Sequence, residues 1–187
     1  DGVDDYAMLD IEDWNGNFTI SQWVWANTTS QSNYSSTFAI DNSAGSNQSF
    51  QHAILGSQWR LHNNQSKVFG DVIPNEWSHL VTTYDAGYVN QYLDGVLVNT
   101  NYYPNGSLNN FKLYKIGVNR ANSSHFEGLI DNVMIWYTAL ENSSITVLNR
   151  NIINNCSAYS GNGQNVAYLE TVHSIPENFT NHAWVVY

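Results

Sequence analysis

Short segments of alternating apolar and polar residues, separated by turn residues, run through most of the 187-residue chain. In the segment 18–25 (FTISQWVW), Phe18, Ile20 and Val24 fall on one side of an extended strand and two tryptophans on the other, because successive side chains point to opposite faces. Apolar groups on both sides predict a central strand of a sandwich. Further strands are predicted at 6–9, 37–40, 50–55, 58–62, 77–84, 88–93, 96–101, 112–118 and 128–136. Many short strands at short spacing indicate an all-β sandwich.

Turn and cap residues add detail to this outline. Asp94-Gly95 lies between two alternating segments and predicts a tight hairpin, because both residues accept the positive φ angles of a type I′ turn. One short helix is predicted near 142–150, with Asn142 or Ser143 as its cap and apolar residues at helical spacing.

The alternating pattern weakens beyond about residue 150. We therefore divide the chain into a β domain, 1–150, and a C-terminal extension, 151–187. The extension is expected to add strands to the sandwich, at 165–169 and 182–187, or to contact a neighbouring molecule.

Composition and charge exclude several classes of partner. The net charge is −10, and the chain has six cations: Lys67, Lys112, Lys115, Arg60, Arg120 and Arg150. Nucleic-acid binding needs clustered lysine and arginine, so no nucleic acid is expected as a partner. No apolar run is long enough for membrane insertion. The single cysteine, Cys156, excludes an internal disulfide and is either a plain thiol or paired outside this chain.

Asn-x-Ser/Thr sequons are more frequent than the composition alone would give. They begin at Asn17, Asn27, Asn33, Asn47, Asn64, Asn105, Asn122, Asn142, Asn155 and Asn178. Most fall between apolar segments, where a glycan would project outside the fold. They predict a heavily N-glycosylated extracellular protein or one on a cell or particle surface. The alternative is that loops rich in Asn and Ser produce sequons without being modified.

Four stretches, in order, carry a resemblance to a known family. They are 1–6 (DGVDDY), 18–24 (FTISQWV), 77–85 (WSHLVTTYD) followed by Tyr92-Leu93-Asp94-Gly95, and 126–136 (FEGLIDNVMIW) followed by Ala139-Leu140. Together they resemble the laminin G-like, concanavalin A-like lectin and glucanase family over about residues 1–150. The resemblance implies an all-β, two-sheet antiparallel jelly roll. It does not identify a ligand, because the family includes both lectins and hydrolases.

The chain departs from the family pattern at two places that matter. Asn132 stands where the family usually has Glu, and the strand that normally precedes the opening motif is missing. The second departure implies an open sheet edge, which invites pairing with another strand from the tail or from another protomer.

Residue patterns for catalysis are absent from the sequence. Family glucanases use paired carboxylates in a Glu-x-Asp-x-x-Glu motif, whereas Glu127 and Asp131 are four residues apart. Neither a Gly-x-Ser-x-Gly motif nor a zinc-ligand cluster occurs. We therefore expect a domain that is not an enzyme.

Calcium is the cofactor that the sequence favours, in a structural role. Calcium takes several oxygen ligands, and the resemblance extends a family calcium site to Asp131 and the opening turn with Asp1, Asp4 and Asp5. The alternative is that Asp131 accepts backbone N–H bonds and that the first aspartates are solvated.

Sugar binding needs exposed aromatic rings beside polar hydrogen-bonding groups. The ligand-binding residues predicted on this ground are Trp59, Arg60, His62, Trp14, Tyr102 and Tyr103, with Tyr34, Tyr88, Asn63, Asn64 and Arg120 as further candidates. The other tryptophans, Trp23, Trp25, Trp77 and Trp136, are predicted in the core.

The sequence thus predicts a non-catalytic extracellular recognition domain, lectin-like or adhesive, whose partners are glycans or other extracellular proteins. The alternative is self-assembly: a glycosylated structural subunit of a surface filament, coat or adhesin, joined through its tail and sheet edges.

Overall fold

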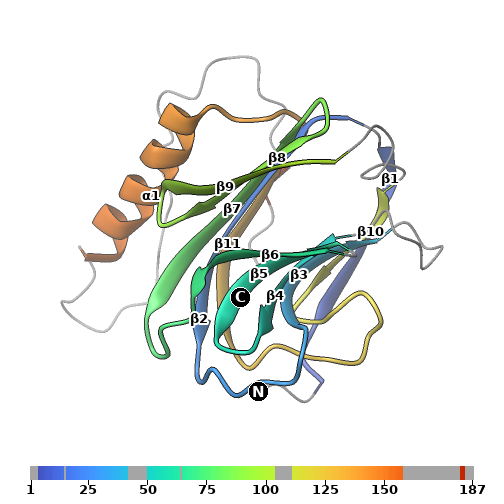
Figure 1. The fold of residues 1–187 in the computed structure, drawn as a ribbon, viewed down its shortest axis with the longest axis vertical. Coiled ribbons are helices and arrows are strands. Elements are labelled where there is room, and N and C mark those ends of the chain that lie inside the picture. Colours follow the sequence, from blue (N-terminus) through green and yellow to red (C-terminus); the bar gives the residue numbers. More distant parts are fainter. Residues whose placement is uncertain are drawn as a thin grey trace.

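Two six-stranded antiparallel sheets face each other in the computed structural model, which describes residues 4–14, 16–41, 50–63, 65–103, 111–157 and 182–183 (Figure 1). Sheet A, in the order β1-β10-β3-β4-β5-β6, consists of β1 (Ala7–Trp14), β3 (Ser35–Asp41), β4 (Phe50–Leu55), β5 (Gln58–Asn63), β6 (Gln65–Asp71) and β10 (Phe111–Ile116). Sheet B, in the order β12-β11-β2-β7-β8-β9, consists of β2 (Phe18–Ala26), β7 (Trp77–Asp85), β8 (Tyr88–Leu93), β9 (Val96–Tyr102), β11 (Gly128–Trp136) and β12 (His182–Ala183). The predicted all-β, two-sheet antiparallel jelly roll with one helix is confirmed.

Strand β2 occupies the centre of sheet B, between β11 and β7, as its two apolar faces predict. Phe18, Ile20 and Val24 are fully buried between the sheets. On the other face, Trp23 stacks on His79 of β7 with ring centroids 4.9 Å apart. The hydrophobic core therefore lies between the sheets, and each sheet also has an outer face that points away from it.

A buried histidine forms hydrogen bonds across this core. His52 of β4 is fully buried; its Nδ1 lies 2.8 Å from Gln22 Nε2 and its Nε2 lies 2.7 Å from Thr82 Oγ1. Because the Gln22 amide nitrogen can only donate, Nδ1 accepts and the Nε2–H donates to Thr82. Burial lowers the pKa of His52 to about 3, so the imidazole is neutral in the folded protein.

Helix α1 (Asn142–Ser157) covers part of the outer face of sheet B (Figure 1). Ile145 is fully buried and forms a small cluster with Val81 of β7 and Tyr92 of β8. The helix runs beyond the predicted span of 142–150 and so crosses the expected domain boundary at residue 150.

The start of α1 differs from the prediction by one residue. The carbonyl of Glu141 accepts hydrogen bonds from the amides of Ser144 and Ile145, at 3.0 Å and 3.2 Å. Glu141 therefore occupies the cap position, rather than Asn142 or Ser143, because the cap residue is the one whose carbonyl accepts the first helical bond.

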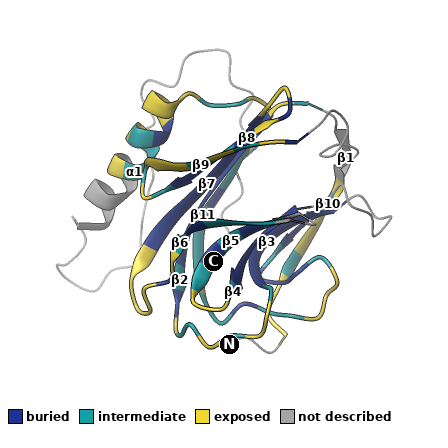
Figure 2. Cartoon of the chain, in the orientation of Figure 1, coloured by how far each residue is buried: buried dark blue, intermediate teal, exposed yellow. Residues whose placement is uncertain are grey.

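The Asp94-Gly95 turn joins β8 to β9 with positive φ at both residues, 51° and 78°. The predicted tight hairpin is therefore confirmed. Strand β9 forms one edge of sheet B, and its side chains are largely exposed (Figure 2). At the other edge, β12 pairs with β11 at Met134 and Ile135.

Several predicted features lie outside the described residues, among them the strand at 165–169 and most of the strand at 182–187. Within the described part of the chain, no helix is long and apolar enough to span a membrane.

Candidate functional site: the polar face of sheet A

The outer face of sheet A carries a cluster of polar side chains that begins on β5. Trp59 and Leu61 point into the core, so the alternation of the strand turns Arg60 and His62 outward. Arg60 Nη2 donates to Gln58 Oε1 at 2.7 Å, and its Nη1 donates to Ser66 Oγ at 3.3 Å. Both of these partners are neutral, and Gln58 in turn donates to Asp71 Oδ1 at 3.1 Å.

Strand register brings further polar residues into line with His62. His62 pairs with Gln51 of β4, Gln51 pairs with Ala39 of β3, and Ala39 pairs with Lys115 of β10. The four residues form one row across the sheet on its outer face. Ala39, Gln51 and Lys115 are buried, so of this row only His62 is partly exposed.

The loop between β10 and β11 crosses this face and places Arg120 beside the row (Figure 1). The amide of Arg120 donates to Gln51 Oε1 at 3.2 Å, and its carbonyl accepts from Lys115 Nζ. Asn119 fixes the loop, because its Oδ1 accepts from the amides of Ala121 and Ser123, both at 3.0 Å.

An aromatic ring stands next to the charged groups. The ring of Tyr34 lies 4.5 Å from that of His62, centroid to centroid. Burial and, to a lesser extent, the nearby Arg120 guanidinium lower the pKa of His62 below its ordinary value. Tyr34 has a φ of 66°, a left-handed conformation that is uncommon for a residue with a bulky side chain. Such strain persists where the surroundings hold it, and it is found preferentially at functional sites.

Unpartnered polar atoms mark this face as chemically unsatisfied. Arg60 Nε, His62 Nδ1 and Asp41 Oδ1 are buried without a hydrogen-bond partner among the described residues, although buried polar groups are normally paired. The other oxygen of Asp41, Oδ2, forms an ion pair with Lys115 Nζ at 3.4 Å. We call the cluster of Tyr34, Asp41, Gln51, Arg60, His62, Lys115 and Arg120 the polar face of sheet A.

The structure separates the predicted ligand-binding residues. Arg60 and His62 come together, with the further candidates Tyr34 and Arg120 beside them. Tyr102 is 58% exposed but lies on β9 of the other sheet, where its ring is 5.0 Å from that of Tyr88.

Two of the rings predicted to be exposed are buried. Trp59 is 1% exposed and Tyr103 is 7% exposed, so neither has a face on which a sugar could stack. The prediction that Trp59 is exposed was wrong, because adjacent strand residues point to opposite faces and Arg60 occupies the outer face. Trp14 lies in β1, and Asn63 in β5, with their side chains outside the description, and Asn64 lies outside the described residues.

Sequence reasoning missed Asp41, Gln51 and Lys115, because only strand register shows that they share a face with Arg60 and His62. It also placed Trp77 in the core, whereas Trp77 is 43% exposed on the outer face of sheet B, opposite Trp25 and in the same row as Leu129. Trp23 and Trp136 are buried, as predicted.

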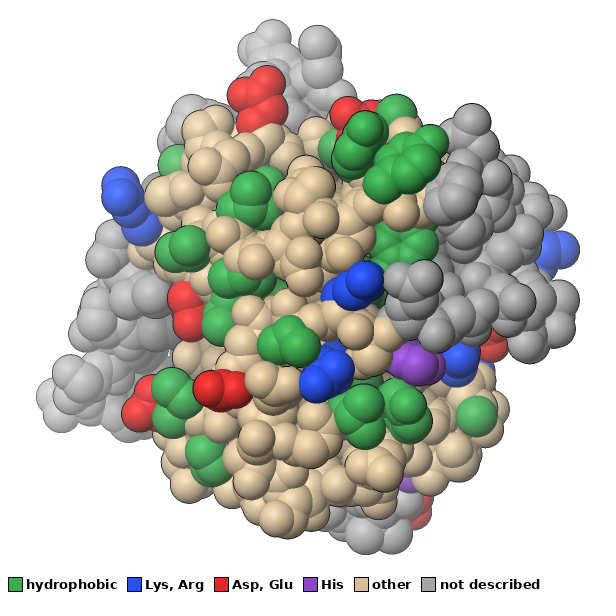
Figure 3. Space-filling model, viewed as in Figure 1, with side chains coloured by type: hydrophobic (Ala, Val, Ile, Leu, Met, Phe, Trp, Pro, Cys, Tyr) green, Lys and Arg blue, Asp and Glu red, His purple; other side chains and the backbone are tan. Residues whose placement is uncertain are grey.

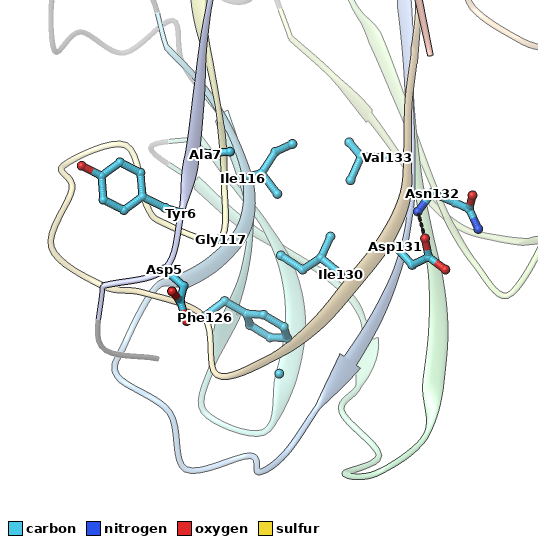
Figure 4. Close-up of a pocket in the computed structure, with 11 residues that line it drawn as sticks. Asp5, Tyr6, Ala7, Ile116, Gly117, Phe126, Ile130, Asp131, Asn132 and Val133 are labelled. Carbon is cyan, nitrogen blue, oxygen red and sulfur yellow. Dashed lines mark hydrogen bonds between the residues drawn. The ribbon is translucent and has the colours of Figure 1, made fainter. Parts of the chain in front are cut away.

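A separate cavity of about 460 Å³ lies between β1 and β11, at one edge of the sandwich (Figure 4). Ile130 and Val133 point into it, whereas the carboxylate of Asp131 points to the opposite side of β11. Asp131 Oδ1 accepts the amide of Asn132 at 2.7 Å, the bond that the alternative to calcium predicts.

Calcium therefore finds no assembled ligand set in the described part of the chain. Asp5 and Asp131 both line the cavity, yet their carboxylates do not converge, and no group of three or more His, Cys, Asp or Glu side chains gathers there. Asp4 is exposed, and Asp1 lies outside the described residues, so the calcium site stays a prediction. Melting curves with calcium and with a chelator would check it; equal midpoints would contradict a stabilising ion.

The predicted glycosylation sites that can be assessed are all on the surface. Asn17, Asn27, Asn33, Asn122 and Asn142 are exposed. Asn155 lies in α1 with its side chain outside the description, and Asn47, Asn64, Asn105 and Asn178 lie outside the described residues. Accessibility, which glycosylation requires, is met at these five positions.

The carboxylates of the polar face bear on whether it could hydrolyse a sugar. Glycoside hydrolysis uses two carboxyl groups that flank the scissile bond. Among its described residues the polar face offers one, Asp41, which is already paired with Lys115.

Comparison with known proteins identifies the family and similar folds. A family model described as the concanavalin A-like lectin/glucanases superfamily matches residues 1–146. No curated protein matches the chain.

Several solved structures share the fold. Domain 4 of AbnA, a GH43 extracellular arabinanase from Geobacillus stearothermophilus in complex with arabinotriose, has a TM-score of 0.59 at 22% identity, covering 72% of this chain and 66% of that one. The ligand-binding domain of botulinum neurotoxin serotype D, in complex with N-acetylneuraminic acid, has a TM-score of 0.61 at 18% identity, covering 80% and 40%. A mutant Trypanosoma rangeli sialidase that displays trans-sialidase activity has a TM-score of 0.59 at 19% identity, covering 72% and 23%. The match thus spans less than half of the toxin and sialidase chains.

Proposed function

Because the chain belongs to the concanavalin A-like lectin/glucanase superfamily, we propose that it is a non-catalytic extracellular domain that binds carbohydrate on the polar face of sheet A. The ring of Tyr34, 4.5 Å from that of His62 and beside the half-buried Arg60, carries this proposal. Sugar hydroxyls would form hydrogen bonds with the accessible part of these polar side chains, and the ring offers an apolar surface to the C–H groups of a pyranose.

Three further observations support a sugar as the ligand. The loop that holds Arg120 is braced by hydrogen bonds within itself and to Gln51, and a rigid site loses little entropy on binding. The side chains of Tyr34, His62 and Arg120 are each half-buried, so part of every one of them remains accessible. Solved structures with this fold contain arabinotriose and N-acetylneuraminic acid.

A glycan array with the purified chain tests the proposal, with the Tyr34→Asn variant alongside it. Asparagine tolerates the left-handed backbone of position 34 and replaces the ring with a short amide. Because the change also creates an Asn-Ser-Ser sequon, all proteins are produced in a host that does not N-glycosylate. We expect the wild type to bind a defined set of glycans and the variant to lose about tenfold or more in affinity.

The matched control is Tyr102→Asn, which removes a more exposed ring from the other sheet and should bind as the wild type does. An array without selective binding, with the folded chain verified by circular dichroism, would refute carbohydrate recognition. Equal losses in both variants would place the site elsewhere.

A second candidate function, self-assembly, has its own supporting observation. Val96, Leu97 and Val98 are exposed on β9, an edge strand of sheet B. Figure 3 shows hydrophobic side chains in the region of β9, on a surface with few charges. An exposed apolar edge strand presents unpaired backbone groups and invites a strand from another copy.

The assembly proposal is tested by sedimentation velocity across a concentration series. Val98→Lys should abolish association by placing a charge on the edge, whereas Val147→Lys, on the exposed side of α1, should leave it unchanged. A wild-type chain that stays monomeric at all concentrations would refute this candidate.

A further inference from the structure

One side of the sandwich is open between β1 and β11. Strand β1 is the edge strand of sheet A there, and β11 lies next to the edge of sheet B. Among the described residues, the partner on the outer edge of β11 is β12, which pairs only with Met134 and Ile135. From Gly128 to Val133 no described strand pairs with this edge, so its backbone groups can accept a further strand.

The cavity of about 460 Å³ lies beside this edge, and part of its wall is the hydrophobic core (Figure 4). Phe126 and Val133 belong to the core between the sheets, and Ile116 and Ile130 pack against it. Apolar walls around a cavity lack the dispersion contacts that a packed core provides. An apolar side chain that enters the cavity therefore stabilises the fold.

The register of β12 determines which residue comes next to the cavity. Ala183 lies opposite Met134 in antiparallel pairing, so one residue further along both strands Trp184 falls opposite Val133. Directly opposite residues project from the same face of a sheet, and Val133 points into the cavity. Extending the pairing by a single residue thus directs Trp184 into the cavity.

The residues that follow β12 have the composition and length that such a strand needs. Residues 184–187 read WVVY and lie outside the described residues. Aromatic and β-branched residues favour strands, and four extended residues reach about 13 Å, enough to run from Val133 toward Ile130. Alternation places Val186 on the same side as Trp184 and Val185 on the opposite side.

We propose that residues 184–187 continue β12 along the outer edge of β11 and close the open side of the sandwich, with the side chains of Trp184 and Val186 in the cavity. The occupant is this chain's own segment, because β12 already brings the chain to that edge. The added strand supplies hydrogen-bond partners to β11 and removes this edge as a pairing site for another molecule. On sheet B this leaves β9 as the edge open to a second copy.

Paired cysteines test the register directly. In the full chain with Cys156→Ser, which removes the one native thiol, Val133→Cys is combined with Trp184→Cys or, as the matched control, with Val185→Cys. Directly opposite residues have Cα atoms about 4.5–5.5 Å apart, within the range that a disulfide spans. We expect mild oxidation to consume both thiols of the first pair within a monomer and to leave the control pair reduced, as measured by thiol alkylation and a non-reducing gel.

Polar substitutions test the burial without any change at β11. Val186→Asn places an amide in the apolar cavity and should lower the melting midpoint by about 4 °C or more. Val185→Asn places the same amide on the outer face and should lower the midpoint by less than about 2 °C. The two variants have the same composition and differ only in which of two adjacent positions is changed.

Three results would overturn the proposal. A disulfide that joins two molecules, seen as a dimer on the gel, would show that the segment of a second copy occupies the edge. A disulfide in neither cysteine pair, or equally in both, would contradict the register. Equal shifts of the melting midpoint for Val185→Asn and Val186→Asn would contradict the burial of Val186 in the cavity.

Discussion

His52 connects the two sheets through hydrogen bonds to Gln22 and Thr82, at a position with no exposed surface. A neutral imidazole fits there, because one ring nitrogen accepts and the other donates. Protonation would turn the accepting nitrogen into a donor facing the Gln22 amide and would place a charge in the core. Burial consequently lowers the pKa of His52 to about 3 from its ordinary value of 6.5.

The first prediction concerns stability against pH. Between pH 6.5 and about 3 the unfolded chain binds a proton at residue 52 that the folded chain does not. The contribution of this residue is intact above pH 6.5 and is lost as the pH falls toward 3, by at most about 1.4 kcal/mol per pH unit. Urea denaturation at a series of pH values measures it.

The His52→Leu variant tests the assignment. It should be less stable near neutral pH by about 1–3 kcal/mol, because Gln22 and Thr82 lose their partner. Its stability should also fall less steeply on acidification. Val147→Ala, at an exposed position without a titratable group, should keep the wild-type slope. An unchanged slope in His52→Leu would contradict the prediction. His79, whose pKa burial lowers to about 4, contributes to the slope in both variants.

At the scale of elements, α1 packs on sheet B through Ile145, with Leu148 partly buried beside it. Ile145 is fully buried against Val81 and Tyr92, whereas Val147, two residues away, is exposed on the helix surface. The hydrophobic face of the helix, and not its own hydrogen bonds, therefore determines whether it stays docked.

The second prediction follows from this contact. Ile145→Ala should lower the free energy of unfolding by about 2–5 kcal/mol, because it leaves a cavity between the helix and the sheet. Val147→Ala, with the same final residue on the exposed side of the same helix, should change it by less than about 0.5 kcal/mol. Chemical denaturation of both variants is the measurement, and equal effects would show that α1 does not pack as described.

Strand alternation explains one success and one failure at this scale. The alternation in 18–25 correctly predicted a central strand, because Phe18, Ile20 and Val24 on its core face are large and apolar. In 58–62 the same periodicity showed that Trp59 and Arg60 lie on opposite faces, yet both were assigned to an exposed site. Which of two alternating faces is buried depends on the sheet stacked against the strand.

At the scale of the whole molecule, the surface is polar but weakly charged, with 12% charged residues in the sequence. All five sequon asparagines whose side chains are described are exposed. Three sequons, at Asn33, Asn64 and Asn122, are within two residues of Tyr34, His62 and Arg120 of the polar face. Glycans at these positions would border the proposed ligand site.

The third prediction is glycosylation itself. Protein from its native source should lose mass on treatment with an N-glycan amidase, and the released asparagines should appear as aspartates in peptide mass spectra. Sequons on the exposed loops, such as Asn33 and Asn122, are expected among them, because an oligosaccharide there meets no packed surface. An unchanged intact mass would contradict extracellular processing of this chain.

The sequence by itself determined the strand segments, the Asp94-Gly95 hairpin, the presence of a helix near 142 and the family, because all depend on local periodicity or on motifs in fixed order. It also supplied Arg60, His62, Tyr34 and Arg120 as separate candidates. Only the tertiary structure decided that these four share one face with Asp41, Gln51 and Lys115. Strand order and register, which depend on packing between segments far apart in the chain, bring these residues together.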